Sequence, residues 1–181
     1  MVRLSQAYLW TSFTLFLSYR KRASAYRMTS PRGKGTLSAL DEVNRLIREN
    51  RVDEYPSATR ELGMRPERFG SGTAEWSWVD QPALVLNQFG VIQGGYLAVF
   101  VDEIFATAIG SVLEQGEWGV TIEVKLSYLR ALFPRPLRGY AKVLYRTRSL
   151  AFLEANVVTS EGETAVTASS TWAIRTQSTR T

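Results

Sequence analysis

The sequence predicts an α+β fold in which one long central helix is wrapped by a single curved antiparallel β-sheet. Residues 96–113, YLAVFVDEIFATAIGSVL, are apolar on nearly every side, which is typical of a helix that is buried all round. Four strand-like runs follow this segment, at 120–129, 139–149, 151–162 and 163–174. A helix and a sheet that each carry an apolar face bury those faces against one another, so this order of elements indicates one layer of each.

Two further elements are expected before the long helix. LSALDEVNRLIREN (37–50) places its leucine, valine and isoleucine side chains on one face at helical spacing, which predicts a helix. A loop marked by Gly63 and Pro66 follows, and residues 69–80 alternate around two tryptophans, which predicts a strand. We therefore expect one domain at 36–176, a size that a single hydrophobic core can support.

The run 120–129 shows strand alternation most clearly. Its apolar residues are expected on one face of the strand, and they are Val120, Ile122, Val124 and Leu126. The long helix is expected to stop before Gly116, a residue type that favours helix ends. Ser160-Glu161-Gly162 is expected to form the turn of a hairpin between the last two strands.

Histidine and cysteine are both absent from the sequence. Without them, the chain holds no Ser-His-Asp or Cys-His nucleophile system, no zinc site of the usual Cys and His type, and no disulfide. Any acid–base chemistry therefore falls to Asp, Glu, Lys or Tyr, or to a bound cofactor. The hydrophobic fraction of 45% and charged fraction of 22% are typical of a chain that packs a core.

The net charge of +5 comes from the N-terminal part of the chain. Residues 1–40 contain seven Lys or Arg and no Asp or Glu, whereas residues 41–181 contain 15 basic and 17 acidic residues. A nucleic-acid-binding domain carries its positive charge on the fold itself. This distribution therefore argues against a nucleic-acid partner.

Residues 1–35 are expected to be an appendage to the domain. The apolar run 7–19 is too short to cross a bilayer as a helix, so no membrane span is predicted. Three interpretations stay open: a disordered extension, a targeting peptide, or a chain whose true start is Met28, which we favour. A cytoplasmic location is expected, or an organellar one if the segment is a transit peptide. Residues 177–181 are expected to form a C-terminal tail.

The block 87–109, NQFGVIQGGYLAVFVDEIFATAI, holds the residues best suited to chemistry. Gly94 and Gly95 open the long helix, where the first N–H groups lack acceptors within the helix and the helix dipole adds positive potential. A ligand can approach a glycine backbone closely, and such a site stabilises negative charge that develops on a carbonyl oxygen. Asp102 lies two turns further along an apolar helix. A carboxylate in such surroundings costs free energy unless it has a polar partner or a functional role.

Eight residues separate Gly94 from Asp102, which is about 12 Å along a helix axis. One reacting carbonyl cannot lie near both groups of one chain. Either the two groups serve different purposes, or two chains pair so that Gly94 of one faces Asp102 of the other, as happens twice in a two-fold dimer. On the residues alone, a plain helix start at the glycines and a structural ion pair at Asp102 stay open.

The block resembles the PaaI-like (phenylacetate-degradation) group of hotdog-fold acyl-CoA thioesterases. The resemblance rests on Asn87, Gly90, Gln93-Gly94-Gly95 and Asp102, and it extends over about 60–175. Further counterparts lie downstream, at Gly119-Val120-Thr121, Ser127-Tyr128-Leu129-Arg130, Gly139 and Glu163-Thr164-Ala165.

The resemblance implies a hotdog fold, a homodimer or homotetramer with active sites at the subunit interface, and hydrolysis of an acyl-CoA to free acid and CoA with no cofactor or metal. It implies that Asp102 acts as nucleophile or as general base on water, and that the backbone N–H of Gly94 polarises the thioester carbonyl. Asn87 matches a side chain near the attacking water or the carbonyl, and Thr121 matches an assisting hydroxyl. In the family, the glycine and the acid of one site come from different subunits.

One position departs from the family. Gln93 stands where histidine is commonest, and its amide can form hydrogen bonds but cannot titrate. This departure leaves open the alternative of a non-catalytic protein that binds acyl-CoA or regulates through it. A hydratase on the same fold is disfavoured, because those relatives generally use a histidine.

Other residues are candidates to contact the two parts of the substrate. On the coenzyme A side they are Gly95 and Arg130, with Arg135 and Arg138 nearby, although for any single arginine a solvated loop charge is the better interpretation. On the acyl side they are Phe89, Tyr96, Phe100 and Phe105, although most of these are expected to be plain core.

Overall fold

The structure is a computed structural model that describes residues 49, 58–114 and 116–176. These residues fall within one compact unit, Leu37–Thr181. Nearly all of the predicted helix at 37–50, and both predicted terminal segments, lie outside the described residues. Within the described ranges, no helix is long and apolar enough to cross a membrane.

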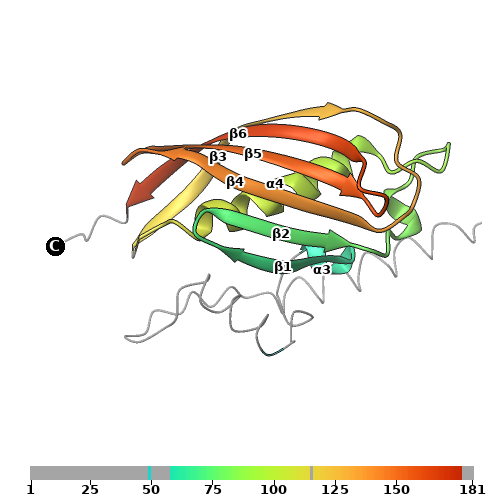
Figure 1. The fold of residues 1–181 in the computed structure, drawn as a ribbon, viewed down its shortest axis with the longest axis horizontal. Helices are drawn as coiled ribbons and strands as arrows, with labels where there is room; N and C mark the ends of the chain where they lie inside the picture. The colour runs from blue at the N-terminus through green and yellow to red at the C-terminus, as the bar shows by residue number, and fades with distance from the viewer. Residues whose placement is uncertain (1–48, 50–57, 115, 177–181) are drawn as a thin grey trace, which may run out of the picture. The chain divides into compact units, whose positions relative to one another are not determined.

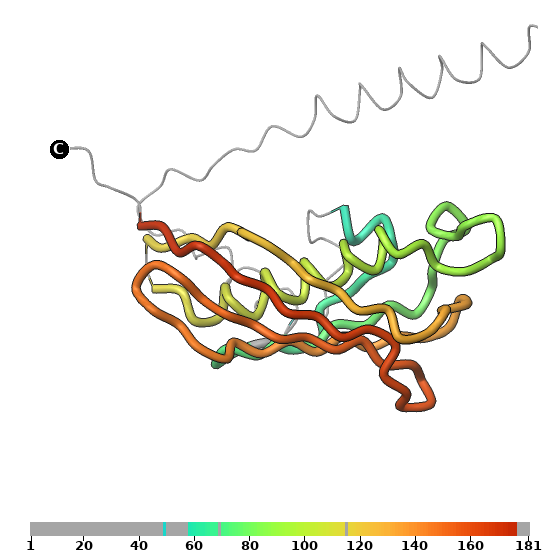
Figure 2. Tube along the Cα trace, turned by 90° about the horizontal axis from the view of Figure 1, so that it is seen from above, coloured from blue at the N-terminus to red at the C-terminus, as the bar shows by residue number. Residues whose placement is uncertain are grey.

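Six antiparallel strands form one curved sheet that wraps around helix α4, Gly94–Gly110 (Figure 1). The strands are β1 (Met64–Gly70), β2 (Thr73–Trp78), β3 (Glu117–Tyr128), β4 (Leu137–Arg146), β5 (Leu150–Thr159) and β6 (Thr164–Thr176). A short helix α3 (Ala58–Glu61) and a 3-10 turn η2 (Ala83–Val85) precede α4. Figure 2 shows the strands crossing α4 obliquely. The predicted α+β hotdog fold is confirmed.

The strand order across the sheet is β1-β2-β4-β5-β6-β3. All four strands predicted after the helix are present within a few residues of the expected bounds, and Gly162, with φ of 83°, lies in the predicted turn between β5 and β6. Only β4, β5 and β6 follow one another as a meander. β3 does not lie beside β4 but crosses to pair with β6, which makes β3 an edge strand.

The predicted single strand at 69–80 is wrong, because a hairpin occupies this region. Ser71 and Gly72 take positive φ values of 53° and 80°, which turn the chain between β1 and β2. The loop expected around Pro66 is instead part of β1. Proline lacks a backbone N–H but is tolerated here, because β1 is an edge strand whose register with β2 shifts directly after Pro66.

Helix α4 packs one face against the sheet. Phe100 and Ile104 are fully buried, and a Cβ added at Gly139 of β4 would lie only 2.0 Å from Ile104 Cδ1. The opposite face is open, since Val99 is 40% exposed and Asp102 is half-buried. The expectation of a helix buried all round is therefore wrong for a single chain, because the sheet covers only one side of it.

A β-bulge interrupts the edge strand β3. The register with β6 shifts at Ile122, which is the extra residue. Val120 and Ile122 are 42% and 56% exposed, whereas Val124 and Leu126 pack against the core. The prediction that all four share one buried face is therefore wrong for the first two, because the bulge shifts the alternation.

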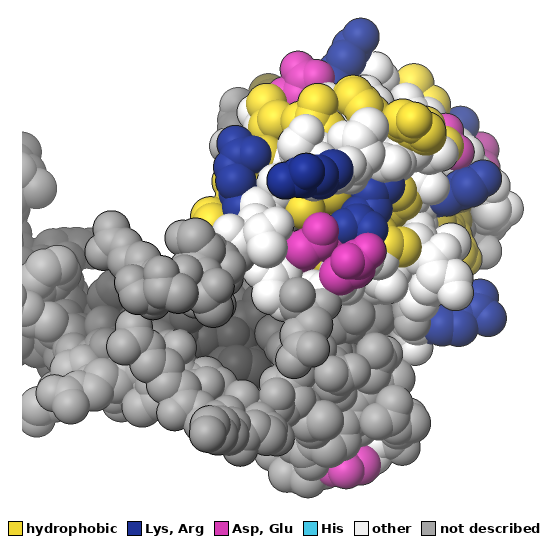
Figure 3. Space-filling model, turned by 90° about the vertical axis from the view of Figure 1, so that its left-hand side faces the viewer, with side chains coloured by type: hydrophobic (Ala, Val, Ile, Leu, Met, Phe, Trp, Pro, Cys, Tyr) yellow, Lys and Arg dark blue, Asp and Glu magenta, His cyan; other side chains and the backbone are white. Residues whose placement is uncertain are grey.

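Large hydrophobic side chains are exposed where β3 begins and β4 ends. They are Trp118, Val120, Ile122, Leu144, Tyr145 and Phe152. Figure 3 looks at this end of the sheet and shows hydrophobic side chains gathered along its upper side, with Lys and Arg side chains below them. No other described strand pairs with the outer edge of β3, so this edge presents backbone groups as well as apolar side chains to its surroundings.

Candidate active site

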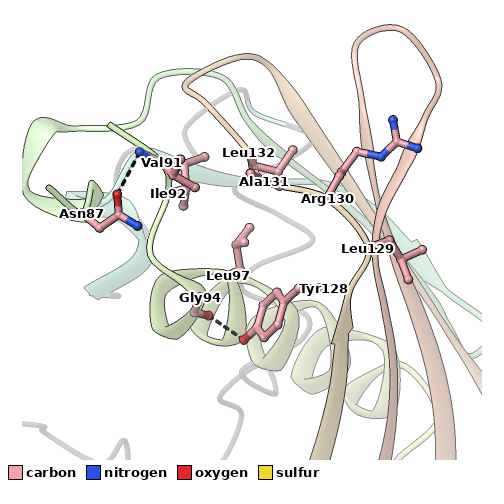
Figure 4. A pocket seen from close by; sticks show the side chains of 10 residues that line it. All are labelled: Asn87, Val91, Ile92, Gly94, Leu97, Tyr128, Leu129, Arg130, Ala131 and Leu132. Atoms are coloured by element: carbon pink, nitrogen blue, oxygen red, sulfur yellow. Dashed lines mark hydrogen bonds between the residues drawn. The ribbon is translucent and has the colours of Figure 1, made fainter. Parts of the chain in front are cut away.

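A cavity of about 420 Å³ lies at the N-terminal end of α4 (Figure 4). It is bounded by the loop before the helix, the first turn of the helix, and the segment that follows β3. The residues that line it are Asn87, Val91, Ile92, Gly94, Leu97, Tyr128, Leu129, Arg130, Ala131 and Leu132. Most of the lining residues are apolar, and Asn87, Tyr128 and Arg130 add polar groups around the cavity, a mixture typical of a small-molecule site.

The loop before α4 is held by Asn87. Its Oδ1 accepts hydrogen bonds from the N–H groups of Phe89 (2.9 Å) and Val91 (3.2 Å), and its own N–H donates to the carbonyl of Val91 (2.8 Å). Gly90 supplies the positive φ of 73° that this tight loop needs. The Nδ2 amide of Asn87 has no acceptor among the described residues, so it is free to donate to a molecule in the cavity.

Gln93 precedes the first residue of α4 in an extended conformation. Its N–H donates to the carbonyl of Val85 (2.9 Å), and its side chain is exposed and makes no capping hydrogen bond. The N–H groups of Gly94 and Gly95 have no acceptor within the described residues, as expected for a first helical turn. Gly94 lines the cavity, so this end of the helix offers backbone donors and positive potential to a ligand there.

Asp102 and Thr121 form a second polar cluster. The Thr121 hydroxyl donates to Asp102 Oδ1 at 3.1 Å, which joins β3 to the open face of α4. Neither residue lines the cavity. The chain therefore brings Asn87 and Gly94 together at one place, and Asp102 and Thr121 together at another. This arrangement agrees with the helix-length argument, and the joining of both clusters in one site stays a prediction.

Glu103 is a titrating group that the sequence analysis did not single out. Burial raises the pKa of Glu103 above its ordinary value of 4.5, and the neighbouring carboxylate of Asp102 raises it further. Both effects disfavour the charged form. No local pattern in the sequence distinguishes Glu103 from a solvated helix charge, because its burial depends on how the sheet wraps the helix.

We expect the Glu103→Gln variant to be more stable than the wild type at neutral pH. Because the folded chain has the raised pKa, the protonated carboxyl of Glu103 stabilises the fold fully below pH 4.5, and this contribution is lost as the pH rises through the raised pKa. Glutamine stays neutral throughout. Thermal unfolding between pH 4 and 8 should show the variant's higher Tm at pH 7 and 8 fading towards pH 4. A difference that does not change with pH would contradict this assignment.

The arginine candidates are all engaged in ion pairs. Arg130 lines the cavity but points away from it in Figure 4, and its guanidinium lies 2.5 Å from a carboxylate oxygen of Glu163. Arg135 and Arg138 pair with Glu161 (3.6 Å) and Glu75 (3.0 Å), respectively. These pairs lie at the surface, where they are weak and can exchange partners. A role for Arg130 on the coenzyme A side therefore stays a prediction.

None of the four aromatic candidates for the acyl side lines the cavity. Phe100 and Phe105 are fully buried core residues, Tyr96 packs against the core, and Phe89 is 73% exposed on the loop. Asn87, Gly94 and Arg130 line the cavity as candidates from the sequence, but most of the other lining residues were not predicted, above all Leu97 and Tyr128. Tyr128 entered only as part of a matching motif, and a contact between the end of β3 and the start of α4 has no signal in local sequence.

Comparison with known proteins identifies the family. The family model of the thioesterase superfamily matches residues 89–166. A conserved protein from Pseudomonas aeruginosa is 30% identical with a TM-score of 0.61, and the match covers 66% of this chain and 94% of that one. The chain belongs to the thioesterase superfamily. Membership indicates the hydrolysis of thioesters and confirms the family resemblance seen in the sequence.

Other members of the superfamily have closely similar folds. A phenylacetic acid degradation-related protein from Ralstonia eutropha is 26% identical with a TM-score of 0.64, covering 72% of this chain and 98% of that one. A thioesterase from Haemophilus influenzae is 20% identical with a TM-score of 0.65, covering 81% and 96%. At that identity the likeness concerns the fold alone. No protein with a curated description matches the chain.

Proposed function

We propose that the protein is an acyl-CoA thioesterase that hydrolyses its substrate to a free acid and CoA at a site shared by two chains. The observation that carries the proposal is the cavity at the start of α4, where free backbone N–H groups and the Asn87 amide meet in a chain of the thioesterase superfamily. Donors fixed in this way stabilise the oxyanion that forms when a thioester carbonyl is attacked.

The proposed reaction uses one group from each chain. The carbonyl oxygen of the thioester accepts a hydrogen bond from Gly94 N–H of one chain. Asp102 of the partner chain either takes a proton from the attacking water or attacks the carbonyl carbon itself, which gives a mixed anhydride that water then hydrolyses to the free acid and the Asp102 carboxylate. The carbon–sulfur bond then breaks and the CoA thiolate leaves, which needs little acid assistance because a thiol is a good leaving group. Thr121, bonded to Asp102 Oδ1, holds the carboxylate in one orientation.

The open faces of the chain support pairing with a second copy. β3 is a twelve-residue edge strand with exposed apolar side chains, and the open face of α4 beside it carries Val99 and Asp102. Long exposed edges of this kind are templates for strand pairing. Pairing of β3 with its two-fold mate would bring the open faces of both helices together, and with them Asp102 of one chain towards Gly94 of the other.

The direct test is the release of thiol from a panel of acyl-CoA substrates with short, long and aromatic acyl groups. We expect turnover of at least one class and release of one CoA for each acid formed. Matched thioesters of N-acetylcysteamine should react more slowly if the coenzyme A portion contributes to binding. Binding of acyl-CoA with no release of thiol from any substrate would instead indicate the non-catalytic alternative.

We expect the Ile122→Lys variant to be monomeric and inactive. Ile122 is 56% exposed at the bulge of the edge strand, so the lysine is tolerated by the isolated chain, but a charge at this position opposes pairing of the two edges. Light scattering coupled to size exclusion measures the mass. Lys142→Ala, an exposed change in β4, serves as the control. A dimeric and active Ile122→Lys variant would exclude this part of β3 from the interface.

A further inference from the structure

Tyr128 ties the end of β3 to the first turn of α4. It is the last residue of the strand, and its hydroxyl donates to the carbonyl oxygen of Gly94 at 2.8 Å (Figure 4). Its ring and Gly94 line the same cavity. Among the described residues, this is the hydrogen bond that connects a side chain of β3 to the helix start.

The Tyr128 ring leaves little room for a side chain at residue 94. A Cβ at this position would lie 3.1 Å from Cζ and 3.2 Å from the hydroxyl oxygen of Tyr128, closer than side chains normally approach. A Cβ at Gly95, in contrast, would meet nothing within 4 Å. Gly94 does not take a positive φ, so its backbone conformation would accept alanine. The close approach of Tyr128, and not the backbone conformation, therefore disfavours any side chain at this position.

The hydrogen bond also acts on the backbone donors. Because a peptide unit is planar, holding the carbonyl of Gly94 also fixes the direction of the N–H of Gly95 in the same unit. A bond to that carbonyl polarises the unit and makes the N–H a better donor. The Tyr128 ring also occupies the space directly beside Gly94, which leaves that residue little room to move.

We propose that Tyr128 is a positioning residue, which fixes the 94–95 peptide so that the N–H groups at the start of α4 point at the thioester carbonyl. The inference rests on the proposed function for its catalytic consequence. The physical coupling between Tyr128 and Gly94 does not depend on that function. The two parts can therefore be tested separately.

The hydroxyl is tested with Tyr128→Phe, which keeps the ring. We expect kcat to fall about tenfold, which corresponds to the free-energy contribution of one hydrogen bond. KM should stay nearly unchanged, because this hydrogen bond orients the backbone donors and does not contact the substrate. Tyr145→Phe is the matched control, since Tyr145 is 64% exposed on the outer face of the sheet, and it should behave as the wild type. A wild-type kcat for Tyr128→Phe would overturn the role of the hydroxyl.

The ring is tested with a double-mutant cycle made of Gly94→Ala, Tyr128→Leu and the variant that carries both changes. Tm and kcat are measured for each of these variants and for the wild type. Gly94→Ala should lower Tm and kcat in the wild-type chain. In the Tyr128→Leu chain it should leave kcat unchanged and raise Tm, because alanine favours helix once the ring is gone. If Gly94→Ala alone fails to fold, recovery of folded protein in the double variant would equally show that the Tyr128 ring causes the effect of the alanine.

Equal effects of Gly94→Ala in both chains would overturn the coupling. The Tm cycle remains informative even if the wild type releases no thiol from any acyl-CoA. In that case the proposed function fails, while the dependence of the Gly94→Ala effect on Tyr128 still supports or excludes the contact.

Discussion

Replacing Asp102 with asparagine should slow the release of thiol by about 10²–10⁴, the usual weight of a general base or acid. Asparagine keeps the shape of the side chain and can still accept a hydrogen bond from the Thr121 hydroxyl, which donates to Asp102 Oδ1 in the wild type. It can neither take a proton from water nor attack a carbonyl. The fold, the Tm and the oligomeric state should therefore stay close to those of the wild type.

The neighbouring acid provides the control for this result. Glu103→Gln makes the same change of charge one residue away, on a side chain to which no part of the reaction is assigned. Its turnover should match that of the wild type, while its Tm responds to pH as described above. Normal turnover by Asp102→Asn would end the proposed mechanism. Equal losses in both variants would show that the charge of the helix face matters and not Asp102 itself.

Two inactive chains should restore activity when they are paired. Asp102→Asn lacks the carboxylate, and Gly94→Pro lacks the N–H that polarises the carbonyl. Proline is well tolerated at the first position of a helix, and the extended conformation of Gln93 suits a residue before proline. A dimer with one chain of each kind contains one site with both defects and one site with none. It should therefore recover about half of the wild-type rate.

Co-expression with two different tags, followed by purification on both, isolates this mixed dimer. Each parent variant, purified alone, gives the background rate. The proline ring also meets Tyr128, so the circular dichroism and elution volume of Gly94→Pro must match the wild type before its rate is interpreted. A mixed dimer as inactive as its parents would mean that the glycine and the acid act within one chain, contrary to the proposal.

Local patterns in the sequence predicted the elements with strong periodicity. The apolar segment that became α4 and the four strands after it were all expected close to their observed bounds. The hairpin of β1 and β2 was not, because Pro66 resembles a loop residue unless the strand is known to lie at an edge. The pairing of β3 with β6 joins residues that lie far apart in the sequence, such as Tyr128 with Val166 and Thr121 with Trp172, and no local signal specifies it.

In the candidate site, too, features within one element could be predicted from the sequence, whereas contacts between elements could not. The glycines at the helix start and the acid two turns later follow from spacing along one element, so their separation could be argued from the rise of a helix. The contacts of Thr121 with Asp102 and of Tyr128 with Gly94 depend on where β3 lies, and they needed the structure. The raised pKa of Glu103 depends on how deeply the folded chain buries its carboxyl, so it could not be predicted from the sequence either.

The bulge at Ile122 has a consequence for the start and for the middle of helix α4. Thr121 and Tyr128 are an odd number of residues apart, so in a regular strand their side chains would point to opposite sides of the sheet. The extra residue between them reverses the parity, and both side chains reach α4, one at its carboxylate and one at its first turn. A chain without that extra residue could keep either contact but not the two together, so this small irregularity lets a single strand serve two distant points of the helix.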